Sequence, residues 1–267
     1  MKKIKFFMMA ICAIALASCG NKTQQQTEDQ DTVKSFEQEQ IEAGIRTQLD
    51  SIAGILGNLK QLPMLKDTKN GQIQLTEQEK QVKPDYLLDP ITASDAVTLS
   101  EKYRVLTALS IDEAIAELYG MDVTAYNEAT AKLAADINDP GFRIFAEGGD
   151  LQVESKEIYD AEVKAGRLNY FWQAVATSIV EQLYILEQNT DKFLPCFTDD
   201  DVANLTYRIA ILQEAINRLT EYDPEIVEVA EAIKPLETLN AITVDDFKKE
   251  LQDMSEQIVE SRNQLVK

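Results

Sequence analysis

The chain has 267 residues, of which 45% are hydrophobic, and a formal net charge of −20 at pH 7. Such an acidic surface repels phosphates, so we expect no nucleic acid among its partners. The sequence has no histidine and only three cysteines, which excludes histidine-based nucleophilic triads and histidine-ligated zinc or iron. Any catalysis is therefore left to carboxylates, lysines, tyrosines and hydroxyls, and we predict that the protein is not an enzyme.

Residues 1–18 have the pattern of a secretory signal peptide. A cationic head with three lysines precedes an apolar run from Phe6 to Ala17, and small residues follow up to Cys19. The apolar run is shorter than the ~20 residues that span a bilayer as a helix. We predict that residues 1–18 are removed, which takes three lysines and no acid away and changes the net charge to −23.

The four residues Leu16-Ala17-Ser18-Cys19 resemble the lipobox of bacterial lipoproteins. In that class the cysteine thiol receives a diacylglycerol, the peptide is cut just before it, and the new amine is usually acylated. The resemblance implies that Cys19 carries covalent lipid in place of any other cofactor, and that the chain binds a membrane through this anchor. Gly20 stands where many inner-membrane lipoproteins have aspartate, which implies the outer membrane, facing the periplasm or the cell surface.

Residues 19–35 are rich in Gln, Thr, Asp and Glu, and we predict that they form a flexible tether. From Phe36 the apolar residues recur every three or four positions, which predicts a long amphipathic helix ending before Pro63. An irregular stretch follows, up to about residue 93. Further helices are expected over 93–108, 110–120 and 122–138.

The second half predicts one long helix over 154–189, and others that begin after Thr198, Asp223 and Thr243. Residues 36–267 should therefore form an all-α, multi-helix bundle of long amphipathic antiparallel helices. A division into two packed helical lobes near 140–152 stays open. In a general way this body resembles the uncharacterised helical lipoproteins of gut-type Gram-negative bacteria.

One segment resembles a calcium loop. Asp136, Asn138, Gly141 and Glu147 occupy positions 1, 3, 6 and 12 of the EF-hand pattern. However, Pro140 occupies position 5, where an oxygen ligand is needed, and Asn-Asp-Pro-Gly is a common turn sequence. A structural turn is therefore favoured over a metal site.

Three other patterns favour structural roles. Asp199, Asp200 and Asp201 suit a helix N-terminus better than a cation site. Cys196 is expected to be a buried, unreactive thiol. In the Tyr170-Phe171-Trp172 run, the last two residues suit the core and only Tyr170 is expected at the surface.

These patterns together predict a non-catalytic, lipid-anchored envelope protein that acts as a binding or scaffolding module. Its partner would be an envelope protein or a ligand, which the sequence does not identify, and its binding residues are unknown. Two alternatives remain open. One is a calcium- or ligand-binding lipoprotein, and the other is a glycan-cleaving enzyme that uses a pair of carboxylates.

Overall fold

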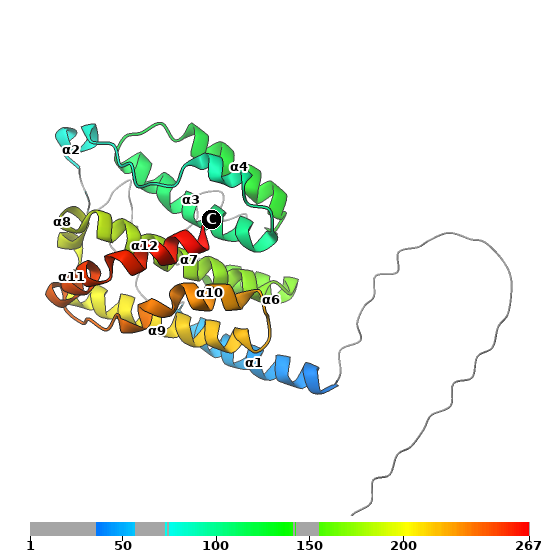
Figure 1. The fold of residues 1–267 in the computed structure, drawn as a ribbon. Coiled ribbons are helices and arrows are strands. Elements are labelled where there is room, and N and C mark those ends of the chain that lie inside the picture. The colour runs from blue at the N-terminus through cyan, green and yellow to red at the C-terminus, as the bar shows by residue number, and fades with distance from the viewer. Residues whose placement is uncertain (1–35, 57–72, 74, 141, 143–154, 267) are drawn as a thin grey trace, which may run out of the picture.

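The computed structural model describes residues 36–56, 73, 75–140, 142 and 155–266, and within them every extended regular element is a helix (Figure 1). This confirms the predicted all-α bundle. The α-helices are α1 (Phe36–Leu56), α2 (Glu77–Gln81), α3 (Leu99–Leu118), α4 (Thr124–Ile137), α6 (Ser155–Ala165), α7 (Leu168–Gln188), α8 (Thr190–Phe193), α9 (Asp199–Thr220), α10 (Ile226–Ile233), α11 (Val244–Asp253) and α12 (Ser255–Leu265). Three short 3-10 turns join them, namely η1 (Pro90–Ser94), η2 (Leu194–Cys196) and η3 (Lys234–Thr238).

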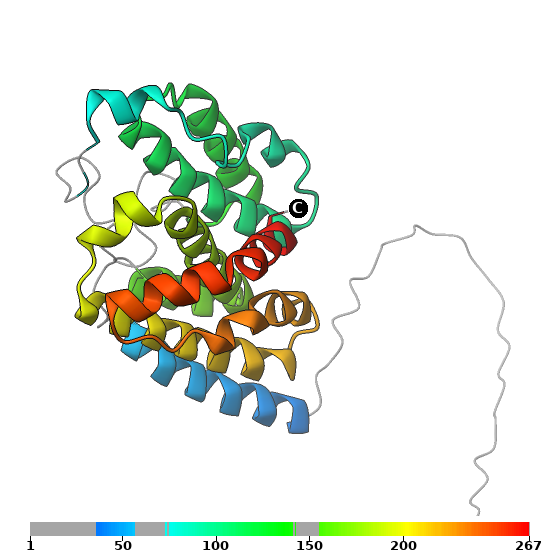
Figure 2. The same ribbon diagram turned by 60° about the vertical axis from the view of Figure 1, so that its left-hand side comes forward.

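Helix α7 lies at the centre of the bundle. Every residue from Phe171 to Leu186 is buried, so this helix has no solvent-facing side over that length. A helix buried all round needs neighbours on every side. Helices α3, α6, α9, α10 and α12 pack against it. Figures 1 and 2 show α3 and α4 at one edge of the bundle, and α9 and α1 at the opposite edge.

A buried ionic triad joins α7 to two of its neighbours. The carboxylate of Glu181 on α7 accepts hydrogen bonds from Arg262 Nε and Nη2 of α12, each at 3.1 Å. Arg262 Nη2 also lies 3.4 Å from Asp112 Oδ2 of α3, which accepts the Leu88 N–H at 2.6 Å. Burial raises the pKa of both carboxyl groups. Because buried charges are tolerated only when paired, this triad restricts how α3, α7 and α12 can pack.

Helix α3 runs without a break where the sequence predicted two helices divided near Ser110. Its start is a capping box in which Thr98 N donates to the Glu101 carboxylate at 2.7 Å and Glu101 N donates to Thr98 Oγ1 at 3.2 Å. The predicted capping box at Ser110 is wrong, since its hydroxyl donates to the Leu106 carbonyl within the helix. A Ser-x-x-Glu pattern alone does not distinguish a helix start from a helix interior.

Two predicted long helices are each divided in the structure. The helix expected over 154–189 is broken at Gly166, which has φ +71° and separates α6 from α7. Arg167 N donates to the Glu162 carbonyl at 2.8 Å and Gly166 N to the Val163 carbonyl at 3.3 Å, the pattern of a Schellman helix end. The last helix is broken at Met254 into α11 and α12. Apolar periodicity continues through both breaks and so conceals them.

Two of the three predicted caps of the later helices are confirmed, at Thr198 and Thr243, whereas α10 begins at Ile226 after Glu225 and has no side-chain cap at Asp223. At the start of α9, Thr198 N donates to Asp201 Oδ2 at 2.9 Å and Asp201 N donates to Thr198 Oγ1, so the acidic run caps the helix. At the start of α11, Asp246 N donates to Thr243 Oγ1 at 3.2 Å, so Thr243 caps this helix. The lobe division near 140–152 stays a prediction, and the helices on its two sides share one hydrophobic core.

Loss of the triad's cation should strongly destabilise the fold. Arg262→Ala leaves Glu181 and Asp112 buried without a positive partner, and such a change costs about 3–5 kcal/mol. Urea denaturation should show this decrease in the free energy of unfolding. The control is Lys156→Ala, which removes an exposed pair with Asp160 and should change stability little. A loss for Arg262→Ala no larger than that of the control would contradict the triad's role.

The break at Gly166 can be tested with a matched glycine. Gly166→Ala places an L-residue in the left-handed region and should destabilise by about 1 kcal/mol. Gly44→Ala, inside α1, should stabilise by about 0.5–1 kcal/mol because alanine favours helix. An added Cβ meets nothing within 4 Å at either position, so backbone conformation decides the sign. Equal signs in urea denaturation would refute the Schellman assignment.

Candidate functional site

The described residues of the calcium-loop pattern serve other purposes. The Asp136 carboxylate lies 3.4 Å from Lys102 Nζ of α3. Asn138 takes the left-handed conformation (φ 49°, ψ 48°) at the C-terminus of α4, and its N–H donates to the Ala134 carbonyl at 3.0 Å. Gly141 and Glu147 lie outside the described residues, as does Cys19, so calcium binding and lipidation stay predictions. Among the residues that the structure describes, no three carboxylate or thiol side chains form a group that could hold a metal ion.

Asp139, which lies between Asn138 and Pro140 of this pattern, is buried in a polar cluster that no sequence pattern predicted. Its carboxylate accepts hydrogen bonds from the Tyr103 hydroxyl and from Arg167 Nη1, the latter at 3.0 Å. The Tyr103 ring stacks on Tyr170 with centroids 4.8 Å apart and meets the Phe142 ring edge-on at 4.6 Å. Tyr170 is therefore half-buried, which corrects the prediction that it lies at the surface.

Glu162 of α6 adds a second carboxyl group to this cluster. Its side chain is fully buried, and neither carboxyl oxygen accepts a hydrogen bond from an N–H or O–H group of the other described residues. Burial, and then the negative charge of Asp139, raise the pKa of Glu162 to about 9, so the group is protonated at neutral pH and can donate to Asp139. The cluster joins α3, the end of α4, α6 and the α6–α7 turn. Because Glu162 is inaccessible to solvent, we interpret the cluster as one that stabilises the packing of these helices.

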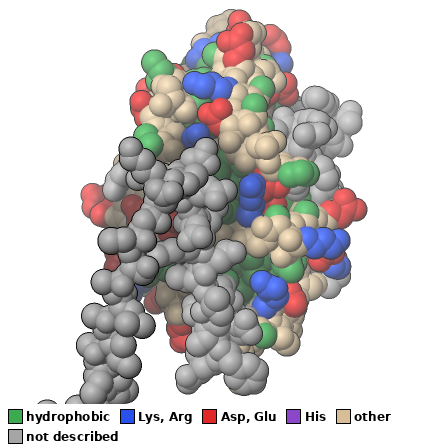
Figure 3. Space-filling view, turned by 90° about the vertical axis from the view of Figure 1, so that its right-hand side faces the viewer, with side chains coloured by type: hydrophobic (Ala, Val, Ile, Leu, Met, Phe, Trp, Pro, Cys, Tyr) green, Lys and Arg blue, Asp and Glu red, His purple; other side chains and the backbone are tan. Residues whose placement is uncertain are grey.

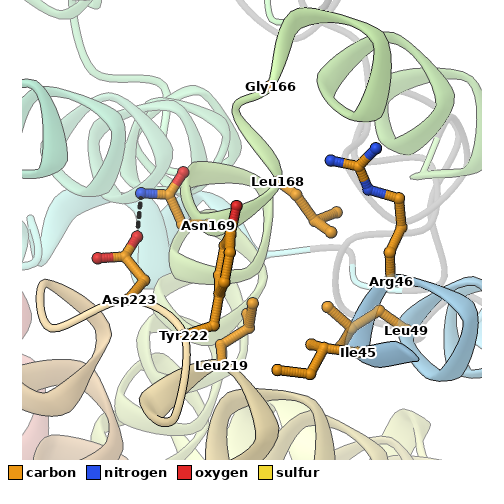
Figure 4. Close-up of a pocket in the computed structure, with 9 residues that line it drawn as sticks. All are labelled: Ile45, Arg46, Leu49, Gly166, Leu168, Asn169, Leu219, Tyr222 and Asp223. Atoms are coloured by element: carbon orange, nitrogen blue, oxygen red, sulfur yellow. Dashed lines mark hydrogen bonds between the residues drawn. The ribbon is translucent and has the colours of Figure 1, made fainter. Parts of the chain in front are cut away.

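A surface pocket of about 110 Å³ lies where α1, the α6–α7 turn and the C-terminal end of α9 meet (Figure 4). We call it the α1/α9 pocket. Its floor is apolar, with each side chain at most 9% exposed, and consists of Ile45, Leu49, Leu168 and Leu219. The first two residues are one helical turn apart on α1, so they face the pocket together. The rim is polar and consists of Arg46, Gly166, Asn169, Tyr222 and Asp223.

The two charged groups of the rim differ in how they are engaged. Asn169 Nδ2 donates to Asp223 Oδ2 at 2.6 Å, and Glu225 N donates to Asp223 Oδ1 at 2.9 Å. Asp223 is thus occupied in joining α7 to the turn before α10. The Arg46 guanidinium, in contrast, makes no hydrogen bond or ion pair with another described residue, and it lies across the pocket from Asp223 (Figure 4).

Cys196 is half-buried at the end of η2, where the sequence predicted full burial. Burial raises the pKa of its thiol, which keeps it in the less reactive protonated form. Charged side chains of both signs are interspersed on the face shown in Figure 3.

Glu162 should make the stability of the protein depend on pH. The unfolded chain loses the Glu162 proton above an ordinary pKa of 4.5, whereas the folded state keeps it to about 9. Stability should therefore fall as pH rises between these values, and Glu162→Gln should reduce that slope. Urea midpoints measured across this range would show it. The control is Glu157→Gln, an exposed glutamate on α6, and an equal slope in the two variants would refute the raised pKa.

Comparison of the sequence with protein-family models, with curated proteins and with solved structures found no match. Within the described helices, none is long and apolar enough to cross a membrane. A functional proposal for this protein therefore depends on its own residues and geometry.

Proposed function

We propose that this protein is anchored by lipid on Cys19 to the bacterial outer membrane, and that its helical body binds or scaffolds another envelope component without catalysis. The observation that carries the proposal is the sequence Leu16-Ala17-Ser18-Cys19 at the end of a complete signal-peptide pattern. Two or more acyl chains on one residue hold a protein durably at a membrane, where one chain does not.

The chain between the anchor and the body suits this role. Sixteen residues, most of them polar or charged, separate Cys19 from Phe36, where α1 begins. A chain of this length can extend over roughly 50 Å. The acidic composition adds repulsion between the body and anionic headgroups. Both properties favour a body that stands away from the bilayer and is free to meet a partner.

The α1/α9 pocket supports binding better than it supports cleavage by a pair of carboxylates. Glycan cleavage by carboxylates needs two acids placed on either side of the scissile bond. The residues that line the α1/α9 pocket include one carboxylate, Asp223, and two backbone or side-chain donors already engage it. The alternative of a ligand-binding lipoprotein is favoured by a specific observation, namely that Arg46 beside an apolar floor has no hydrogen-bond or ion-pair partner in the part of the chain that the structure describes.

Lipidation can be tested by growing cells that express the full chain with tritiated palmitate. The wild type should incorporate label into the mature protein, and Cys19→Ala should lose the label and keep its signal peptide. Cys196→Ala is the matched control, because it removes the other cysteine beyond the signal and should stay labelled. A labelled Cys19→Ala protein, or an unlabelled wild type, would disprove the anchor.

A further inference from the structure

We propose that the α1/α9 pocket binds a small carboxylate with a short aliphatic chain. The carboxylate would pair with the Arg46 guanidinium, and the chain would lie on Ile45 and Leu168, the two floor residues that keep some solvent exposure. The inference rests on the proposed function and deepens it, since it names the chemical class of a ligand for the binding body.

The state of Arg46 is the first argument. The other described arginines all have partners: Arg104 binds Gln173, Arg167 binds Asp139, Arg218 binds Glu214, Arg262 binds Glu181, and Arg208 is also engaged. In a chain with 46 acidic and 26 basic residues, a guanidinium left without a carboxylate is unexpected. Its planar fork of donors matches a carboxylate in two parallel hydrogen bonds.

Two acids near Arg46, Asp50 on α1 and Asp223 in the pocket, already accept hydrogen bonds. Asp50, one turn further along α1, accepts the Tyr159 hydroxyl at 2.6 Å. Both oxygens of Asp223 accept hydrogen bonds from Asn169 and Glu225. Among the described residues, the pocket therefore offers a guanidinium with no hydrogen-bond or ion-pair partner and no carboxylate without one, which favours an anionic ligand over an amine or a zwitterion.

The size and lining of the pocket specify the rest of the ligand. Its volume of about 110 Å³ suits a small ligand of about half a dozen non-hydrogen atoms. The apolar floor favours an aliphatic group. Helix α7, 21 residues long, begins at the pocket, and the positive end of its dipole adds to the attraction for the carboxylate.

The test is a titration with sodium butanoate, followed by ¹⁵N NMR of the mature chain without its lipid (residues 20–267), which keeps every described residue. Saturable shifts should appear at the amides of Gly166, Leu168 and Asn169, with a dissociation constant on the order of millimolar for so small a ligand. n-Butanol, which lacks the charge, should bind at least about tenfold more weakly. Acetate, which lacks the chain, should also bind more weakly.

Two variants distinguish a specific effect of the Arg46 guanidinium from the general effect of losing one positive charge. Arg46→Gln should weaken butanoate binding about tenfold or more. Lys132→Gln removes one positive charge from an exposed position on α4 and should leave binding unchanged. Equal binding by Arg46→Gln and wild type, equal binding of butanoate and n-butanol, or no saturable shift would overturn the inference. Palmitate labelling of Cys19 would still test the anchor, so the two failures can be told apart.

Discussion

The burial of α7 on every side is the constraint on which the rest of the structure depends. A helix with no exposed face still carries polar side chains, and each needs a partner from a neighbouring element or from its own turn. Gln173 accepts a hydrogen bond from Arg104 of α3 at 2.9 Å, Gln182 donates to Ser178 at 2.8 Å, and Glu181 pairs with Arg262 of α12. The two pairings between helices, of Gln173 with Arg104 and of Glu181 with Arg262, fix where α3 and α12 lie along α7, because a shift of one turn would leave a buried polar group unpaired.

The pocket follows from the way in which this central helix begins. The left-handed conformation of Gly166 ends α6 and lets α7 leave in a new direction, which brings Asn169 beside Asp223. Their hydrogen bond ties α7 to the turn between α9 and α10. Helix α1 packs against α6 and α9 and closes the remaining side. A concave surface thus forms where three chain segments meet, with Arg46 at its edge.

Local signals predicted part of this architecture well. The caps at Thr198 and Thr243, the end of α4 at Asn138, and the inward stripe of α7 were all readable, because each depends on residues within about a turn of one another. The predicted break at Ser110 and the unbroken helix across Gly166 were wrong. At Ser110 the Ser-x-x-Glu pattern is the same for a helix start and a helix interior, and the structure decides for the interior, where the hydroxyl donates to the Leu106 carbonyl. At Gly166 the glycine is a local signal for a helix end, but the apolar periodicity continues past it.

The sequence by itself determined the all-α class, the acidic balance and the helix caps, and it predicted the lipid anchor from four adjacent residues. Only the tertiary structure decided which buried charges pair, as for Arg262 with Glu181 and Asp112, which lie 81 and 150 positions away. It also decided that Glu162 keeps its proton beside Asp139, and that Arg46 has no hydrogen-bond or ion-pair partner among the described residues at the edge of an apolar floor. The physical reason is one of distance along the chain. Which side chains pair, and which are buried, depends on how the whole chain packs, whereas a helix cap or an amphipathic stripe depends on residues close in sequence.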